Sequence, residues 1–200
     1  MYKHFFKALE VLKATSSVNE VFQHVEQIAV QADRESTFMK LAKFFARQGR
    51  TDQASRFAFA IRDEHQRILC LQEVARVLRR KGPLELGQPF IKQACEEAAS
   101  FKGSNWDTAN LFLSLSSELY EFGDTSEALA LLYRAMALAG QDRGEGASKF
   151  LCVSSMQLTK LKRPEEARAV AEKIGHNWFR KHALAELEKS FREPQIPNQE

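Results

Sequence analysis

The sequence predicts an all-α protein, and three observations support this fold class. Ala, Leu, Glu, Lys, Arg and Gln, all good helix formers, dominate the 200 residues. Apolar residues recur at the three- and four-residue spacing of an amphipathic helix. No stretch alternates polar and apolar residues as a strand would, and no Asn-Gly or Asp-Gly turn joins β-branched runs. Because Gly and Pro interrupt the pattern at intervals, we expect short helices joined by tight turns.

The clearest hairpin of two helices covers residues 108–140 and turns at Gly123. Its apolar stripe keeps one face of a 3.6-residue helix on both sides of the turn. Small residues stand where the two helices would meet. The positions predicted to be buried are Phe112, Leu115, Ser116 and Leu119 before the turn, and Ala128, Leu132 and Ala135 after it.

The same spacing of buried positions on both sides of a turn, which we call the frame, recurs along the chain. Its other turns are at Ser16, Gly49, Gly82 and Lys162. In chain order, the predicted hairpins cover residues 5–28, 38–61, 71–94, 112–135 and 151–174, and a last helix covers 184–191. Two longer gaps between turns contain the loop-like segments 100–107 and 140–146, so the extra length need not disturb the frame.

A second recurrence places an arginine six residues after an isoleucine at the end of a hairpin. Arg34, Arg67 and Arg180 share this position. We expect each arginine to bind the carbonyls that end the preceding helix or a nearby acidic side chain. A contact with a ligand is the alternative.

The frame resembles the tetratricopeptide-repeat (TPR) family, whose pattern consists of such small and large apolar positions. The resemblance covers roughly residues 2–191 and implies a right-handed α-solenoid of antiparallel helical hairpins. A compact helical bundle is the alternative architecture. We expect one TPR-like domain over residues 1–192, with about five helix pairs. The segment 193–200 has two prolines and little to bury, so we expect it to be disordered.

Motifs for catalysis, metals and cofactors are absent from the sequence. The five histidines are scattered, no Cys-x-x-Cys or His-Glu-x-x-His occurs, and no phosphate-binding glycine motif follows a strand. Cys70, Cys95 and Cys152 each fall in an apolar helical pattern, where buried reduced thiols are expected. We therefore expect that the protein is not an enzyme and that it binds no metal and no cofactor.

The TPR resemblance implies that the first helix of each hairpin lines a concave groove. Transferred to this sequence, the groove residues that we expect to contact a partner are Met39, Lys43, Arg47, Gln72, Arg76, Arg79 and Arg80. A groove this rich in arginine would bind an acidic peptide or protein, since guanidinium groups form paired bonds to carboxylates. The alternative is that these cations only form a solvent-exposed helix face and contact no partner.

The sequence leaves other functions open. The net charge of +3 is mildly basic, and acidic residues interrupt the cations, which disfavours RNA or DNA as the partner without excluding it. A TPR-type chaperone for a secreted or regulatory partner and a homo-oligomer are further alternatives. No apolar run reaches the roughly 20 residues that cross a bilayer, so we expect no membrane span and a cytoplasmic location. The partner's identity is not encoded in any motif.

Overall fold

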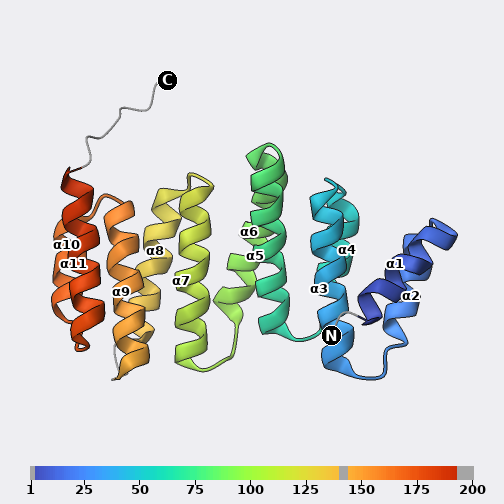
Figure 1. Ribbon diagram of the computed structural model, residues 1–200, viewed down its shortest axis with the longest axis horizontal. Helices are drawn as coiled ribbons and strands as arrows, with labels where there is room; N and C mark the ends of the chain where they lie inside the picture. The colour runs from blue at the N-terminus through green and yellow to red at the C-terminus, as the bar shows by residue number, and fades with distance from the viewer. Residues whose placement is uncertain (1–2, 140–143, 193–200) are drawn as a thin grey trace. The chain divides into compact units, whose positions relative to one another are not determined.

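The computed structural model describes residues 3–139 and 144–192 (Figure 1). These residues form eleven helices and no strand, which confirms the all-α fold class. The predicted disorder of 193–200, and residues 140–143 of the predicted loop 140–146, lie outside the described residues.

The chain divides into two compact units, Met1–Lys102 and Gly103–Glu200. A single repeat domain over residues 1–192, and a solenoid rather than a bundle, stay predictions. The helices of the first unit are α1 (Lys3–Thr15), α2 (Val18–Glu26), α3 (Gln31–Arg47), α4 (Thr51–Phe59), α5 (Glu64–Lys81) and α6 (Leu84–Ser100). Those of the second are α7 (Asn105–Glu121), α8 (Thr125–Ala139), α9 (Glu145–Lys160), α10 (Pro164–Glu172) and α11 (Asn177–Arg192).

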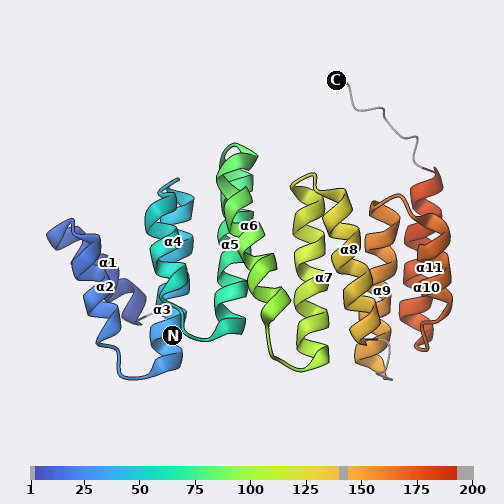
Figure 2. The ribbon, with the colours of Figure 1, turned by 180° about the vertical axis from the view of Figure 1, so that it is seen from behind.

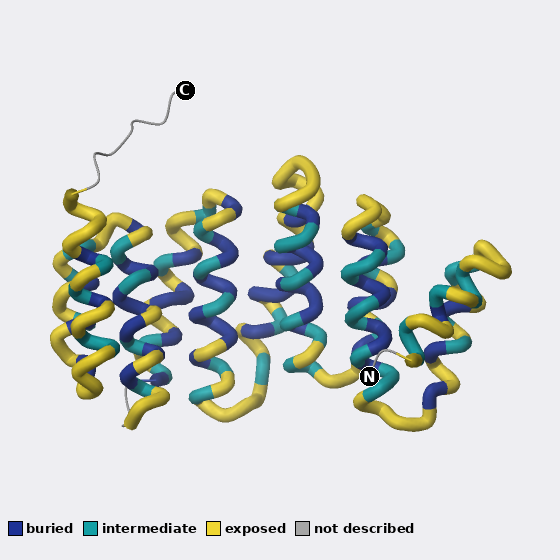
Figure 3. Tube along the Cα trace, in the orientation of Figure 1, coloured by how far each residue is buried: buried dark blue, intermediate teal, exposed yellow. Residues whose placement is uncertain are grey.

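Within each unit, successive helices pair as hairpins, and the first helices of neighbouring hairpins also contact one another. In the first unit, α1 packs on α2, α3 on α4 and α5 on α6, while α3 touches both α1 and α5. In the second unit, α7 packs on α8, α9 packs on α10, and α9 also touches α7 and α11. Buried residues accordingly lie where helices face one another, as Figure 3 shows.

Four of the five predicted turn positions have left-handed backbone. The φ angle is 55° at Ser16, 70° at Gly49, 86° at Gly123 and 59° at Lys162. This conformation ends a helix by turning the next backbone N–H groups toward its last carbonyls. The fifth position, Gly82, ends α5 in extended backbone, with φ −156°.

Small residues allow close contact between the helices of a hairpin, as the sequence predicts. Ser116 Oγ donates to the carbonyl of Ala128 at 2.6 Å, and Ser155 Oγ donates to the carbonyl of Ala167 at 2.8 Å. The two serines occupy the same position of the frame in different hairpins. The corresponding pair in the hairpin of α3 and α4 is Ala42 and Ala54, and both are fully buried.

The recurring arginines act as structural clamps at two of the three positions. Arg34 Nη1 donates to the carbonyl of Ile28 at 3.2 Å, and Arg67 Nη1 donates to the carbonyl of Ile61 at 3.0 Å. Arg67 also pairs with Glu97 at 2.7 Å. At the third position, Arg180 instead donates to the side chain of Asn177 at 3.3 Å.

Candidate functional site

The predicted contact residues all belong to α3 and α5 of the first unit. These helices lie side by side and run in the same direction, as both ribbon views show (Figures 1 and 2). We name the surface along their line of contact the α3/α5 seam. Met39, Lys43 and Arg47 follow one another at four-residue intervals, so they form one stripe of α3 along this seam.

Glu73 of α5 anchors the middle of the α3/α5 seam. Its carboxylate accepts the Lys43 ammonium across the seam at 3.1 Å and also accepts the Arg76 guanidinium from one turn further along α5. All three side chains are about 30% exposed. Two of the predicted partner contacts are therefore already engaged with the same acidic group.

The cations at the carboxyl ends of the two helices are more open. Arg47 at the end of α3 and Arg80 and Lys81 at the end of α5 are exposed, whereas Arg79 is half-buried. Arg47 and Lys81 line a small cavity of about 250 Å³ together with Leu78 and Leu86. This end of the seam thus combines positive charge with apolar surface.

Gln72 does not reach this surface. Its side chain is only 2% exposed, so the expectation that it contacts a partner is not met. The neighbouring Cys70 is fully buried, and burial raises the pKa of its thiol to about 12 although Lys43 acts in the opposite direction. A thiol that stays protonated is a poor nucleophile.

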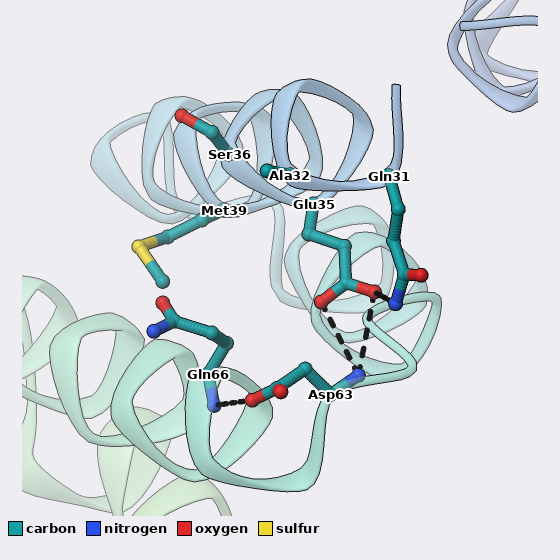
Figure 4. A pocket seen from close by; sticks show the side chains of 7 residues that line it. All are labelled: Gln31, Ala32, Glu35, Ser36, Met39, Asp63 and Gln66. Atoms are coloured by element: carbon teal, nitrogen blue, oxygen red, sulfur yellow. Dashed lines mark hydrogen bonds between the residues drawn. The ribbon is translucent and has the colours of Figure 1, made fainter. Parts of the chain in front are cut away.

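A larger cavity of about 520 Å³ lies at the opposite end of the α3/α5 seam (Figure 4). Ala32 and Met39 of α3 form apolar parts of its wall, and Glu35 and Asp63 contribute carboxylates. Glu35 Oε1 accepts a hydrogen bond from Gln31 Nε2 at 2.9 Å, and Glu35 Oε2 accepts one from the backbone N–H of Asp63 at 3.2 Å.

Helix capping explains why the second carboxylate is found here. Asp63 is the N-cap of α5, and its Oδ1 accepts the backbone N–H of Gln66 at 2.8 Å. Capping residues of this type are favoured because they satisfy a helix N–H that has no partner within the helix. Through its bond to Glu35, the same residue ties the start of α5 to α3.

The sequence interpretation missed Glu35, Asp63, Glu73 and Lys81 as residues of the seam. Two of them had a usable signal: Glu73 stands three residues before Arg76, the spacing of a helical ion pair, and Asp63 precedes an apolar helical run as an N-cap does. The burial of Glu35 had no such signal, because it depends on the approach of α5 to α3.

Among the described residues, no group of three His, Cys, Asp or Glu side chains is placed to hold a metal ion. Within the same residues, no helix has the length and apolar character to cross a membrane. What the seam does offer is two cavities and an uneven distribution of charge between them.

Comparisons with known proteins support the fold class but no function. No protein-family profile matches the chain, and no curated protein matches it. The solved structure titled "Crystal structure of Ton1535 from Thermococcus onnurineus NA1" superimposes over 92% of this chain with a TM-score of 0.54 and 16% sequence identity. The chain spans 56% of the length of that structure. This helical neighbour agrees with the all-α fold of the present chain.

Proposed function

We propose that this chain is a non-enzymatic protein-interaction scaffold that binds an acidic peptide segment of a partner protein along the α3/α5 seam. The observation that carries this proposal is the group of exposed cations at the carboxyl ends of two adjacent helices, namely Arg47, Arg80 and Lys81. Carboxylates are their natural counter-charge, and each arginine can bind one through two parallel hydrogen bonds.

We also propose that the hairpins are TPR-like repeats that stack as a solenoid. Two recurrences support this view: the serine bond to the facing alanine carbonyl, found in two hairpins, and the left-handed turn residue, found in four. In such an array the first helices of successive hairpins line the binding face, and α3 and α5 are first helices. The burial of all three cysteine thiols, Cys70, Cys95 and Cys152, fits a location in the reducing cytoplasm.

Binding of a synthetic acidic peptide tests the proposal directly. The probe is a fluorescein-labelled Gly/Ser peptide that carries three consecutive glutamates, and fluorescence anisotropy at low salt gives its dissociation constant. The double variant Arg47→Ala/Arg80→Ala should bind it roughly fivefold more weakly, since exposed ion pairs contribute about 0.2–1 kcal/mol each. Equal binding by this variant and the unchanged protein would refute the proposed site.

A matched control removes two exposed cations elsewhere. Arg168 and Lys173 lie on or beside α10 in the second unit, and both are exposed. Arg168→Ala/Lys173→Ala removes the same net charge as the seam variant, so it should keep the affinity of the unchanged protein. Circular dichroism checks that both variants remain helical.

The same assay separates peptide binding from nucleic-acid binding. A labelled single-stranded oligonucleotide of random sequence replaces the peptide, and salt is titrated from low to moderate concentration. Contacts with many phosphates would give tight binding that falls steeply with salt. If the oligonucleotide binds more tightly than the acidic peptide and the seam variant abolishes this binding, nucleic acid replaces the acidic peptide as the partner.

A further inference from the structure

The large cavity at the amino end of the α3/α5 seam is suited to a cationic side chain. Figure 4 shows Glu35 and Asp63 approaching each other from α3 and from the start of α5, with Met39 and Gln66 on the other side of the cavity. The only charged groups among the described residues that line it are these two carboxylates. Its volume of about 520 Å³ leaves ample room for a long side chain.

The carboxylate of Glu35 is held in place but has no positive partner among the described residues. Its side chain is 6% exposed, and its bonds come from the Gln31 amide and the Asp63 backbone. Within the described part of the chain, no Lys, Arg or His nitrogen is within ion-pair distance of it. A buried carboxylate is stabilised most by a cation that also donates hydrogen bonds, and each of its oxygens can accept more than one donor.

The walls of the cavity suit the stem of such a cation. The side chain of Met39 and the methyl group of Ala32 are apolar and lie on the same helix as Glu35. Lysine and arginine bury their methylene stems along apolar surface while their charged ends bind polar groups. A ligand with a lysine or arginine side chain therefore matches both the apolar walls and the carboxylates.

The opposite end of the α3/α5 seam has the reverse charge. The cavity there is lined by Arg47 and Lys81, and none of the described residues that line it carries a carboxylate. At a rise of 1.5 Å per residue, Arg47 lies about 18 Å further along α3 than Glu35. An extended peptide advances about 3.3 Å per residue, so roughly five or six residues would cover this distance.

We propose that the α3/α5 seam recognises a bipolar peptide segment: a lysine or arginine side chain binds in the Glu35 cavity, and acidic residues about five or six positions away bind Arg47, Arg80 and Lys81. This inference rests on the proposed function and adds to it a second anchor of opposite charge. It also fixes the register of the partner, because acidic residues placed beside the lysine would meet the carboxylates of Glu35 and Asp63.

Three labelled peptides test the bipolar motif by fluorescence anisotropy. The first carries a lysine six residues from a Glu-Glu-Glu cluster. It is made in two versions, with the lysine before or after the cluster, because the partner chain could run in either direction along the seam. The second has the same composition with the lysine inside the cluster. The third has glutamine in place of the lysine. We expect one version of the first peptide to bind about tenfold more tightly than the other two, which is the scale of a charged hydrogen bond.

The variant Glu35→Gln decides whether the cavity is responsible. It keeps the shape of the side chain and removes its charge, so the tenfold preference for the spaced lysine should vanish while affinity for the glutamine peptide stays unchanged. Glu96→Gln removes an exposed carboxylate from α6 of the same unit and should leave the preference intact. If Glu35→Gln disrupts the fold, Met39→Lys supplies a competing cation at the cavity wall and should abolish the preference in the same way.

The possible results separate this inference from the function on which it rests. If no acidic peptide binds, or if Arg47→Ala/Arg80→Ala has no effect, the proposed function fails. If the acidic peptides bind through these arginines but the spaced lysine adds no affinity, only the bipolar motif fails. A lysine preference that survives in both Glu35→Gln and Met39→Lys would likewise overturn the assignment of the cavity.

Discussion

Substitutions at the two turns of the second unit should change the free energy of unfolding in opposite directions: Gly123→Ala should lower it and Lys162→Gly should raise it. Gly123 and Lys162 both have left-handed backbone, with φ of 86° and 59°. A side chain in this conformation costs about 1–2 kcal/mol, whereas glycine adopts it freely. A β-carbon added at Gly123 would meet no atom within 4 Å, so the cost of Gly123→Ala is backbone strain alone.

The net effect also includes the unfolded chain. Glycine gives the unfolded state more freedom than alanine or lysine, which offsets about 0.4–1 kcal/mol of the strain. We therefore expect Gly123→Ala to lower the free energy of unfolding by about 0.5–1 kcal/mol and Lys162→Gly to raise it by a similar amount. The turns belong to different hairpins, so the double variant should return close to the original stability.

Urea denaturation followed by circular dichroism measures these differences. At a slope of about 1–3 kcal/mol per molar urea, each single variant should move the midpoint by roughly 0.2–1 M, in opposite directions. Gly175→Ala is the control, since its φ is not in the left-handed range and its β-carbon would meet only Ser148 Oγ at 3.8 Å. A lower midpoint for Lys162→Gly, or an unchanged one for Gly123→Ala, would refute the strain argument.

Three further predictions concern contacts inside the units. Ser116→Ala and Ser155→Ala should each reduce the free energy of unfolding by about 1 kcal/mol in urea, the usual contribution of one hydrogen bond, and no loss in either would contradict this role. Arg67→Ala should cost about 1–3 kcal/mol because it removes the bonds to Ile61 and Glu97, and a cost no larger than that of the exposed Arg62→Ala would contradict the clamp. Burial raises the pKa of the Cys70 thiol from 9.0 to about 12, so this thiol ionises at lower pH in the unfolded chain than in the folded one. The free energy of unfolding should therefore fall between pH 9 and 12, by up to about 1.4 kcal/mol per pH unit relative to Cys70→Ala. Parallel pH curves for the two proteins would contradict this.

The helices and turns were predictable because they depend on local sequence. Apolar residues at helical spacing define the buried face of each helix, and a Gly or short polar segment marks its end. The frame also predicted the facing of Ser116 with Ala128, since small residues at fixed distances from the turn must meet when the hairpin closes. The turn at Lys162 was expected only from its alignment with the glycine turns, and its residue type gave no signal of the positive φ found there.

The α3/α5 seam was harder to predict because it depends on contacts between hairpins. Gln72 was assigned to the surface from the register of the family, yet α5 packs against both α3 and α6 and buries more than one stripe. Glu35 is polar and lies near the start of α3, where a solvated carboxylate would be ordinary. Only the closing of α5 over it, through the Asp63 backbone, makes it a buried acceptor.

The cations of the α3/α5 seam differ in the binding free energy that an acidic ligand would gain from each of them. A carboxylate that binds Lys43 or Arg76 must displace Glu73, so one ion pair replaces another and little free energy is gained. Arg47 and Arg80 form no ion pair within the described residues and would lose only water. Exposed pairs still contribute at most about 1 kcal/mol each, so the carboxyl ends of α3 and α5 alone would bind an acidic segment weakly. A specific partner therefore needs a second, more buried contact, and the cavity around Glu35 and Met39 is the one that the same two helices provide.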